Sequence, residues 1–563
     1  MVSVHWQWVM SDWWAIRSAS AVAYVDQEMP GTPNPKQAAF YSDAVLRNAD
    51  AARADSYPGS LQVGAADSRL EEMVIRLLGG MLRSNALDHP ACSVGCSCGP
   101  LLYGADATSE AHTKLSRDIA TASIVLLKNE DVGQTPALPL QPPIHPGSVP
   151  YTIALVGSAC SRLHRINADR ASWTEGDIYV TGGSGRVIAP QAEVPTIEQA
   201  LQERSAGVGG GFQLLVSRSD NADEAVAIAE GADAVIACGG VTATESIDRA
   251  DLRLHEHNFL ADLAARLGKP VRTLGDSAGA GDGGGMGVGF GSGDTAGVGD
   301  STGAGDAVGV GERRRPLIVL AMAAGPVLTR PWGDAFDAVA LMFLGGAQMA
   351  RAWADVLLGA FSPVGRLPLT LPLDEQASVA PCPHSELTGL LREPCEHSEG
   401  LYIGWRAYIG KPVAYPFGHG LSFTVFDYAF AHGTPAATVS VERSDDEEAY
   451  DDDDDDAPLL ELAVLVSNAG QVAGGEIAQL YLSYPEDADE PPLVLRGFQP
   501  TRVLQPAEAQ SLSFCLTRRD LSVWVASTEI SQGGWRVATG RFELSVGASS
   551  RDIRLKWRFD VTY

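Results

Sequence analysis

Four mainly apolar runs limit most strongly what the middle of this chain can fold into. They occupy residues 151–157, 232–240, 316–321 and 338–343, and each has the length of a single strand. Segments with helical spacing of apolar residues lie between them, for example residues 222–229. A strand that is apolar on both faces must be covered on both faces, which is typical of parallel sheets flanked by helices. The pattern predicts an α/β sandwich over residues 109–430.

The sequence changes character after residue 431. Short segments that alternate or run apolar recur at 460–466, 477–484, 512–516 and 542–546, separated by Gly, Pro and Asn. Regularly spaced short strands with turn residues between them are typical of a β-sandwich. We therefore expect a β-sandwich over residues 431–563.

Two segments of biased composition interrupt these domains. Residues 274–311 are of low complexity, rich in Gly, Ala, Asp and Ser, and carry too little apolar surface to form a core, so they are predicted to be a disordered insertion. The acidic loop at 443–457 contains six consecutive aspartates and is expected to stay solvated, because the like charges repel. Calcium binding is the alternative for the acidic loop, although it lacks the spacing and the glycine of an EF-hand.

The first 90 residues predict a strand followed by helices. Val9 and Met10 form an apolar pair that runs into Ser11, Asp12 and Trp13, which we interpret as a buried strand that ends in a carboxylate. Residues 68–78 have helical spacing, and Gly79 and Gly80 are expected to weaken or end that helix.

A linker rich in Cys, Gly and Ser follows at residues 91–108. It contains Cys92, Cys96 and Cys98, which we interpret as free or paired thiols. A metal site is the alternative, but the sequence suggests no fourth ligand nearby at the usual zinc spacing. Helical spacing resumes at residues 112–127.

Composition excludes several classes of partner. The formal net charge of −29 argues against nucleic acid and against an anionic membrane surface, because both are bound by clustered Lys and Arg. No stretch approaches the roughly 20 apolar residues of a membrane span, and no signal peptide is recognisable at the start. We expect neither an organic cofactor nor a metal.

Several strings together resemble the family 3 glycoside hydrolases, β-glucosidases especially. They are SDW at 11–13 with DQEMPG at 26–31, SIVLLKN at 123–129, SPVGRLPLTLP at 362–372, EGLYIGWRAY at 399–408, PFGHGLSFT at 416–424 and VSNAG at 466–470. The resemblance implies an α/β protein made of a (β/α)8-barrel remnant at 1–90, an α/β sandwich and a fibronectin type III-like domain. In the family the Ser-Asp-Trp string lies near the seventh barrel strand. The resemblance therefore implies that the chain is truncated at its N-terminus and lacks most of the barrel.

The resemblance also implies candidate residues for a retaining glycosidase, which uses two carboxylates. Asp12 matches the nucleophile, and its alternative role is a helix N-cap. Trp13 is the candidate surface on which a sugar ring stacks. Glu245, in the string VTATESIDR at 241–249, is the candidate acid/base. Other members carry a Glu about two residues earlier, where this chain has Ala243, and a structural alternative for Glu245 is an ion pair with Arg249.

Other motifs are expected to be structural. The string GGSG at 182–185 suggests a phosphate loop but lacks the Gly-Lys-Ser/Thr that follows in such loops, so a tight turn is preferred. His419 and Arg366 are expected to form structural hydrogen bonds, and the glycine-rich strings to mark turns of positive φ.

The expected function is hydrolysis of terminal β-linked glycosyl residues from β-glucosides or oligosaccharides, with retention. We expect it to be impaired in this chain, because the barrel residues that hold the sugar are not present. The alternative is a non-catalytic carbohydrate-binding or interaction fragment. By resemblance the protein is expected to be extracellular, and its oligomeric state stays open.

Overall fold

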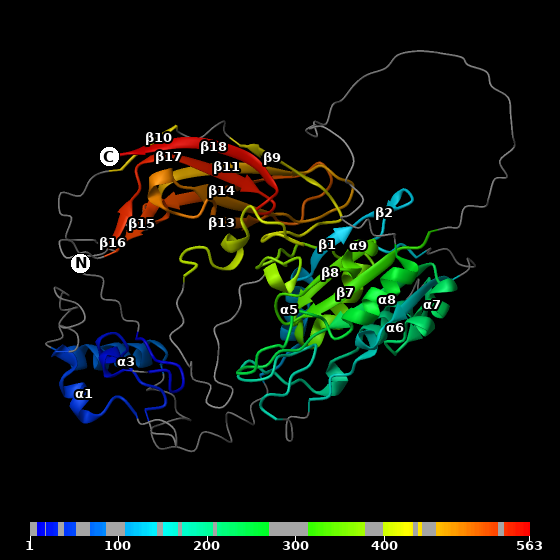
Figure 1. Ribbon diagram of the computed structural model, residues 1–563, viewed down its shortest axis with the longest axis horizontal. Coiled ribbons are helices and arrows are strands. Elements are labelled where there is room, and N and C mark those ends of the chain that lie inside the picture. Colours follow the sequence, from blue (N-terminus) through cyan, green and yellow to red (C-terminus); the bar gives the residue numbers. More distant parts are fainter. Residues whose placement is uncertain are drawn as a thin grey trace, which may run out of the picture. The chain divides into compact units, whose positions relative to one another are not determined.

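The structure is a computed structural model and divides the chain into two compact units, Met1–Thr108 and Ser109–Tyr563, each described by itself (Figure 1). The predictions of disorder at 274–311 and 443–457, and those for Cys92, Cys96 and Cys98, lie outside the described residues. The described residues are 8–16, 18–31, 39–51, 68–85, 107–142, 150–166, 172–206, 211–268, 314–377, 398–431, 437–441, 458–526 and 534–563.

The described part of the first unit is mainly helical. It contains the 3-10 helix η1 (Ala19–Ala23) and the α-helices α1 (Asp43–Arg47) and α3 (Arg69–Arg83). The predicted helix at 68–78 is confirmed, but the expectation that it ends at Gly79 and Gly80 is wrong. A side chain at Gly80 would lie 2.0 Å from the indole of Trp8. The glycine therefore gives the indole room to pack against a helix that continues.

Helix α3 places charged residues inward and apolar residues outward. Arg69, Glu72 and Met73 are buried, whereas Val74 and Leu82 are 46% and 61% exposed. The buried apolar cluster of this unit is correspondingly small and consists of Val22, Ala49 and Met73. Contacts between charged side chains therefore make up much of the interface between this helix and the rest of the unit.

The second unit begins with a six-stranded sheet of order β1-β8-β7-β6-β4-β5. Five of its strands run parallel, and β1 pairs antiparallel with β8 at one edge. The expected helical spacing at 112–127 is wrong at its end, because the helix stops at Ala122 and residues 125–129 form the edge strand. The strands are β1 (Val125–Asn129), β4 (Tyr151–Val156), β5 (Phe212–Ser217), β6 (Ala234–Gly240), β7 (Leu317–Ala323) and β8 (Ala338–Phe343).

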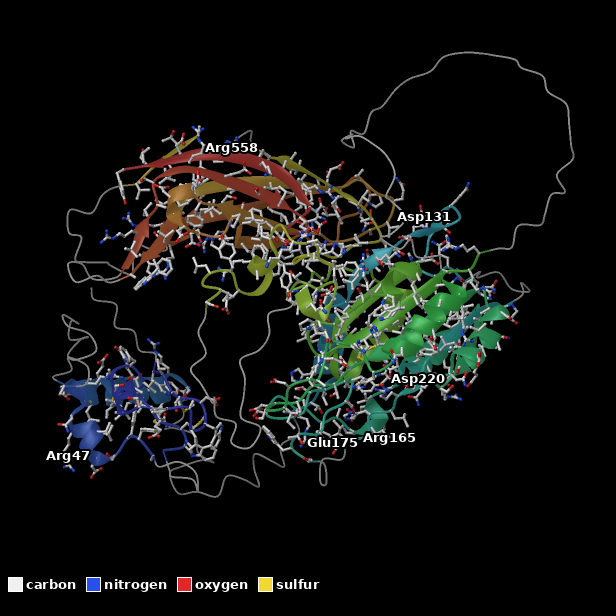
Figure 2. The ribbon with its side chains drawn as sticks, in the orientation of Figure 1. Arg47, Asp131, Arg165, Glu175, Asp220 and Arg558 are labelled. Atoms are coloured by element: carbon white, nitrogen blue, oxygen red, sulfur yellow. A yellow bond between two sulfur atoms is a disulfide. The ribbon has the colours of Figure 1, made fainter. Side chains whose placement is uncertain are left out.

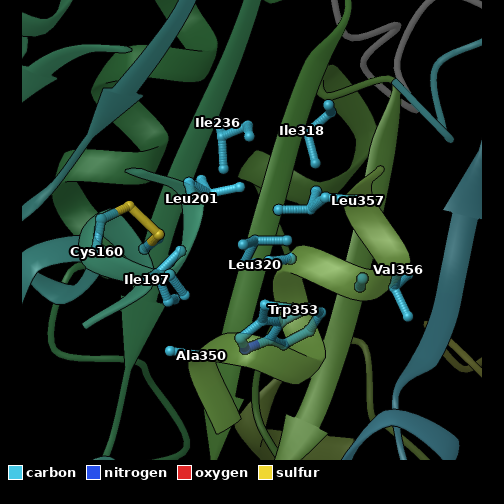
Figure 3. Close-up of a cluster of buried hydrophobic side chains, with 14 of the residues drawn as sticks. Cys160, Ile197, Leu201, Ile236, Ile318, Leu320, Ala350, Trp353, Val356 and Leu357 are labelled. Atoms are coloured by element: carbon cyan, nitrogen blue, oxygen red, sulfur yellow. A yellow bond between two sulfur atoms is a disulfide. The ribbon is translucent and has the colours of Figure 1, made fainter. Parts of the chain in front are cut away.

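Helices cover both faces of this sheet, as the apolar runs predict (Figure 1). Residues of α5 (Glu110–Ala122), α6 (Ile197–Ser205) and α10 (Met349–Leu357) pack on one face. Residues of α7 (Ala222–Glu230), α8 (His257–Leu267) and α9 (Trp332–Ala335) pack on the other. Figure 3 shows the first of these two cores, which includes Trp353 and Leu357 of α10 and Leu320 of β7.

A disulfide crosses the first core, and the sequence analysis did not predict it. It joins Cys160, in the 3-10 helix η2 (Ser158–Ser161), to Cys238 of β6 (Figure 3). The two Cα atoms are 5.2 Å apart and the residues are separated by 78 positions in sequence. The bond therefore ties the segment that follows β4 to the neighbouring strand.

The predicted β-sandwich is present, and its four predicted strands correspond to β11, β12, β14 and β17. A five-stranded sheet has the order β10-β18-β17-β12-β13 and a three-stranded sheet the order β14-β11-β9, with an added hairpin of β15 and β16. The strands are β9 (Phe426–Phe430), β10 (Thr438–Ser440), β11 (Pro458–Asn468), β12 (Ile477–Ser483), β13 (Val494–Pro500), β14 (Ala509–Thr517), β15 (Ser522–Val525), β16 (Gly534–Val537), β17 (Gly540–Gly547) and β18 (Ile553–Thr562).

Short elements complete the second unit. A small hairpin pairs β2 (Asp131–Val132) with β3 (Thr135–Pro136). The remaining 3-10 helices are η3 (Gln191–Glu193), η4 (Gly346–Gln348), η5 (Glu375–Ala377), η6 (Gly404–Tyr408), η7 (Glu486–Ala488) and η8 (Arg519–Leu521). Within the described ranges, we find no helix with both the length and the apolar character needed to cross a lipid bilayer.

The string PFGHGLSFT links the α/β sandwich to the β-sandwich. A ring nitrogen of His419, Nε2, lies 2.8 Å from the carbonyl oxygen of Leu127 in β1. Gln479 of β12 donates from Nε2 to the carbonyl of Gly418 at 3.0 Å. Arg366 of the neighbouring string forms a buried ion pair with Glu476. These contacts agree with structural roles for His419 and Arg366.

The expectation that the glycine-rich strings mark turns of positive φ holds for one glycine of this contact and is wrong for two. Gly418 has φ +78°. Gly365 and Gly420 do not have positive φ; instead, a side chain at Gly420 would lie 2.1 Å from the carbonyl oxygen of Gly365, and one at Gly365 would lie 2.5 Å from the carbonyl of Ile124. These two glycines are required by close backbone contact.

Candidate active site

Asp12 follows a short extended segment that pairs with the DQEMPG string. Met10 and Gln27 form a parallel bridge, and the Ser11 N–H donates to the carbonyl of Gln27 at 3.0 Å. Three residues further on, the Trp14 N–H donates to the carbonyl of Met29 at 2.9 Å. The strings SDW and DQEMPG therefore lie side by side and pair through their backbones.

The interpretation of this segment as a buried strand is wrong. Val9 and Met10 are 50% and 45% exposed. Within the described part of this unit, the strand pairing of the segment is with the DQEMPG string. The N-cap alternative for Asp12 is also not supported, since the next helix begins at Ala19 and is capped by Ser18.

The carboxylate of Asp12 is exposed, and so is the indole beside it. Oδ1 of Asp12 accepts the N–H of Trp13 at 2.8 Å, which fixes one side of the carboxylate. Trp13 is 58% exposed, and its ring centroid lies 5.6 Å from that of Trp14. An exposed carboxylate next to an exposed aromatic face can attack an electrophilic carbon of a ring that stacks on the indole.

Buried ionic groups lie beneath this segment, and the sequence analysis did not find them. Arg69 contacts Asp26 at 2.7 Å and Glu72 at 3.5 Å, and Arg76 pairs with Glu72. Glu28 accepts two backbone N–H groups, from Phe40 at 2.9 Å and from Tyr41 at 2.7 Å. For Arg69, Glu72 and Arg76 the signal in sequence is charged residues at helical spacing on α3, which also carries many apolar residues.

Glu245 lies in the loop that follows β6, and it faces the GGSG loop. Its Oε2 accepts the N–H of Ser184 at 2.7 Å. The two loops are also joined by a parallel bridge between Gly182 and Thr244. Gly183 has φ +93°, and a side chain there would lie 2.3 Å from Cβ of Glu245. A backbone N–H of the GGSG string therefore holds a carboxylate of the chain itself, which agrees with the preference for a tight turn over a phosphate loop.

The electrostatics of Glu245 favour its charged form. The backbone N–H of Ser184 lowers the pKa of the Glu245 carboxyl, whereas a general acid needs a raised pKa. The alternative, an ion pair with Arg249, is not found among the described residues. Arg249 instead donates from Nη1 to the carbonyl of Pro326 at 3.0 Å.

Glu256 fastens the base of the loop that carries Glu245. Its buried carboxylate accepts the N–H of Gly240 at 2.7 Å and contacts Arg162 at 2.6 Å. The His255 N–H donates to the carbonyl of Gly240 at 3.0 Å. The two ends of the loop are thus held together next to the disulfide.

A cavity of about 480 Å³ lies beside this loop, at the edge of the domain where Figure 2 labels Glu175. Its lining includes Thr174, Glu175, Thr242, Asp248, Arg249 and His255. In the ranges that the structure describes, no group of three or more His, Cys, Asp or Glu side chains is arranged to hold a metal ion.

Asp12 and Trp13 belong to the first unit and Glu245 to the second, so each is described within its own unit. The fold of the second unit defines the class of protein: a parallel α/β sandwich followed by a fibronectin-like β-sandwich. The family model for the glycosyl hydrolase family 3 C-terminal domain matches residues 124–275 and 307–423. The model for the fibronectin type III-like domain matches residues 476–550.

Relatives of known name match most of the chain. "Probable beta-glucosidase L" of Emericella nidulans is 30% identical over 98% of this chain and 66% of its own length. "Beta-glucosidase cel3A" of Pyricularia oryzae is 29% identical over 98% of this chain and 65% of its own length. The crystal structure of beta-D-glucoside glucohydrolase from Trichoderma reesei matches with a TM-score of 0.69 and 25% identity, over 99% of this chain and 68% of that chain.

The chain belongs to glycosyl hydrolase family 3, through its C-terminal domain and its fibronectin type III-like domain. It spans about two thirds of the length of the curated relatives that it matches.

Proposed function

We propose that this protein acts on terminal β-linked glycosyl residues, with Asp12 as the nucleophile of a retaining glycosidase. The observation that carries the proposal is the exposed carboxylate of Asp12, fixed by the N–H of Trp13 next to an exposed indole. The names of the relatives, which are β-glucosidases, support a β-glucoside or an oligosaccharide as the substrate.

The proposed chemistry has two steps. Asp12 attacks the anomeric carbon, the glycosidic bond breaks, and a general acid gives its proton to the leaving oxygen. In the second step the same group takes a proton from water, which attacks the anomeric carbon and releases Asp12. Glu245 is the proposed acid/base. To act as the acid it must first leave the N–H of Ser184, because that hydrogen bond lowers its pKa.

We also propose that the first unit is the remnant of a (β/α)8 barrel. The parallel pairing of Met10 with Gln27, followed by helices, supports this origin. So do the exposed apolar residues of α3, since an outward apolar face needs a partner to cover it. The sugar-holding residues of a barrel come from several strands, so we expect a polypeptide of these 563 residues to have little turnover.

The decisive experiment is covalent trapping with an activated 2-deoxy-2-fluoro-β-glucoside, followed by peptide mapping. We expect a glycosyl adduct on Asp12, none in Asp12→Asn, and an unchanged adduct in Asp43→Asn, which alters an exposed carboxylate of the same unit. An adduct on a different carboxylate would refute the assignment.

A second arm compares the 563-residue chain with one extended upstream by a family barrel. Little turnover of an aryl β-glucoside by the shorter chain, restored in the longer one and lost again with Asp12→Asn, is the expected result. Full turnover by the shorter chain would contradict the impairment.

The second candidate function is non-catalytic carbohydrate binding, which is favoured by the lowered pKa of Glu245 and by the exposure of Trp13. It predicts retention of the chain on an insoluble β-glucan without turnover, and loss of retention in Trp13→Ala.

We propose an extracellular location, which the buried disulfide supports because such bonds persist in oxidising compartments.

A further inference from the structure

We propose that Asp26 is a positioning residue that sets the conformation of the segment carrying Asp12. The effect on catalysis rests on the proposed role of Asp12 as the nucleophile. The effect on the conformation of the segment does not, because it depends only on contacts within the first unit. Asp26 lies 14 residues after Asp12, at the start of the second string.

The side chain of Asp26 has no exposed surface and faces three partners, one of which is Arg76, at 3.6 Å from its Oδ1. Its Oδ2 accepts the N–H of Val9 at 2.8 Å, and its own N–H donates to the carbonyl of Val9 at 2.8 Å. Its Oδ1 contacts Arg69 at 2.7 Å. One buried carboxylate therefore connects the backbone just before Asp12 to helix α3.

A second pair of contacts holds the other side of the same segment. The Met29 N–H donates to Oγ of Ser11 at 2.9 Å, and the Ser11 N–H donates to the carbonyl of Gln27. Val9 and Ser11 are thus fixed on either side of Met10, and Asp12 follows directly. Because Val9 and Met10 are half-exposed, side-chain packing contributes little to holding this backbone in place.

The cluster that contains Asp26 has several contacts on the side of α3. Arg69 is buried, donates from Nε to the carbonyl of Val22 at 3.0 Å, and also contacts Glu72. Hydrogen bonds to a charged acceptor are stronger than neutral ones, so the contact between Val9 and Asp26 is expected to dominate the local stability of the segment. Asp26 and Arg69 therefore attach the segment before Asp12 to helix α3.

The test is hydrogen exchange of the whole chain, read on peptides that cover residues 8–16 and 69–83. Val9→Pro removes the donor without leaving an unpaired buried charge, and Val9→Ala is the matched control that keeps the N–H. In Val9→Pro we expect the amides of Ser11 and Trp14 to exchange about ten-fold faster or more, with α3 unchanged. Val9→Ala should leave both peptides within about two-fold of the parent chain.

Asp26→Asn is the second variant, and it separates positioning from general stability. We expect the 8–16 peptide to lose more protection from exchange than the 69–83 peptide. We also expect the maximal rate of trapping at Asp12 to fall, with little change in the concentration of the 2-deoxy-2-fluoro-β-glucoside that gives half of that rate. Equal loosening of both peptides in both variants, or unchanged exchange at 8–16 in Val9→Pro, would overturn the proposal. Because exchange needs no reaction at Asp12, this failure is distinct from a failure of the proposed function.

Discussion

His419 carries a partly buried imidazole whose protonation state is coupled to folding. Burial lowers its pKa from the ordinary value, and a nearby arginine, Arg366, acts in the same direction. In the folded protein the ring therefore stays neutral in mildly acidic solution, stacked on Tyr415. The unfolded chain binds a proton below about pH 6.5, so this group's contribution to stability falls as the pH drops through that value.

The expected result is a pH-dependent cost of His419→Gln, which cannot titrate. The substitution should lower the free energy of unfolding at about pH 7.5, and its cost should be smaller at about pH 5.5, because only the parent chain loses stability through this group. Denaturant unfolding at the two pH values measures both quantities. A cost that grows on acidification would contradict the assigned direction.

Of the residues near the candidate site, the buried charged ones were the hardest to identify from the sequence. Asp12, Trp13 and Glu245 could be named as candidates from local strings, and the structure finds all three exposed. Asp26 and Glu256, which hold the neighbouring backbone, could not be found, because a carboxylate that will be buried looks like any surface charge until its partner is known. The partner of Asp26 is 43 residues away, and Arg162 is 94 residues from Glu256.

Close backbone contact determines how the string at 416–424 approaches the string at 362–372. Gly420→Ala would place a Cβ 2.1 Å from the carbonyl oxygen of Gly365 and 3.2 Å from Cδ of Arg366. We expect a loss of about 1–3 kcal/mol in the free energy of unfolding, because the overpacked contact is with backbone that cannot move far.

Gly231→Ala is the control for this prediction. It has a negative φ, and its Cβ would meet Leu215 at 3.9 Å, an ordinary contact. Thermal or denaturant unfolding should show a change within about 1 kcal/mol for this variant. Similar losses in both variants would show that close contact at Gly420 is not the cause.

Elements were predicted well where burial on both faces leaves a long apolar run. Strands β4, β6, β7 and β8 were found for that reason, whereas the strands of the β-sandwich were found from their alternating pattern and the turn residues between them. The edge strand β1 was read partly as helix, because residues 124–127 continue the apolar spacing of α5. The helix α3 was read too short, since a glycine that accommodates Trp8 looks the same in sequence as one that ends a helix.

At the scale of the whole molecule, the ion pair of Arg366 with Glu476 joins the α/β sandwich to the β-sandwich. Both side chains are at most 8% exposed. Removing one partner should cost about 3–5 kcal/mol, because the remaining charge is buried without compensation. In a double-mutant cycle, Arg366→Met combined with Glu476→Gln should cost clearly less than the sum of the single changes.

The surface pair of Arg541 and Asp560 provides the comparison for this cycle. These side chains are 71% and 45% exposed, so the same cycle should give a coupling of about 0–1 kcal/mol. Equal coupling in the two cycles would contradict the importance of burial at the domain contact.

The disulfide of Cys160 and Cys238 should contribute to the stability of the α/β sandwich. It closes a loop of 78 residues, and loss of such a bond typically costs roughly 2–4 kcal/mol. Cys160→Ala with Cys238→Ala should therefore lower the denaturant midpoint. Dithiothreitol should shift the unfolding midpoint of the parent chain more than that of the double variant. A parent chain whose midpoint does not change on reduction would refute the contribution.

Whether this bond forms depends on the redox conditions under which the protein is produced. Both sulfur atoms lie within a closed apolar core, so a thiol that is buried before it is oxidised has little access to an oxidant. Two batches of identical sequence, one made in a reducing cytosol and one secreted, would then be different molecules with different lifetimes. Thiol titration under denaturing conditions should therefore precede any comparison of variants between expression hosts.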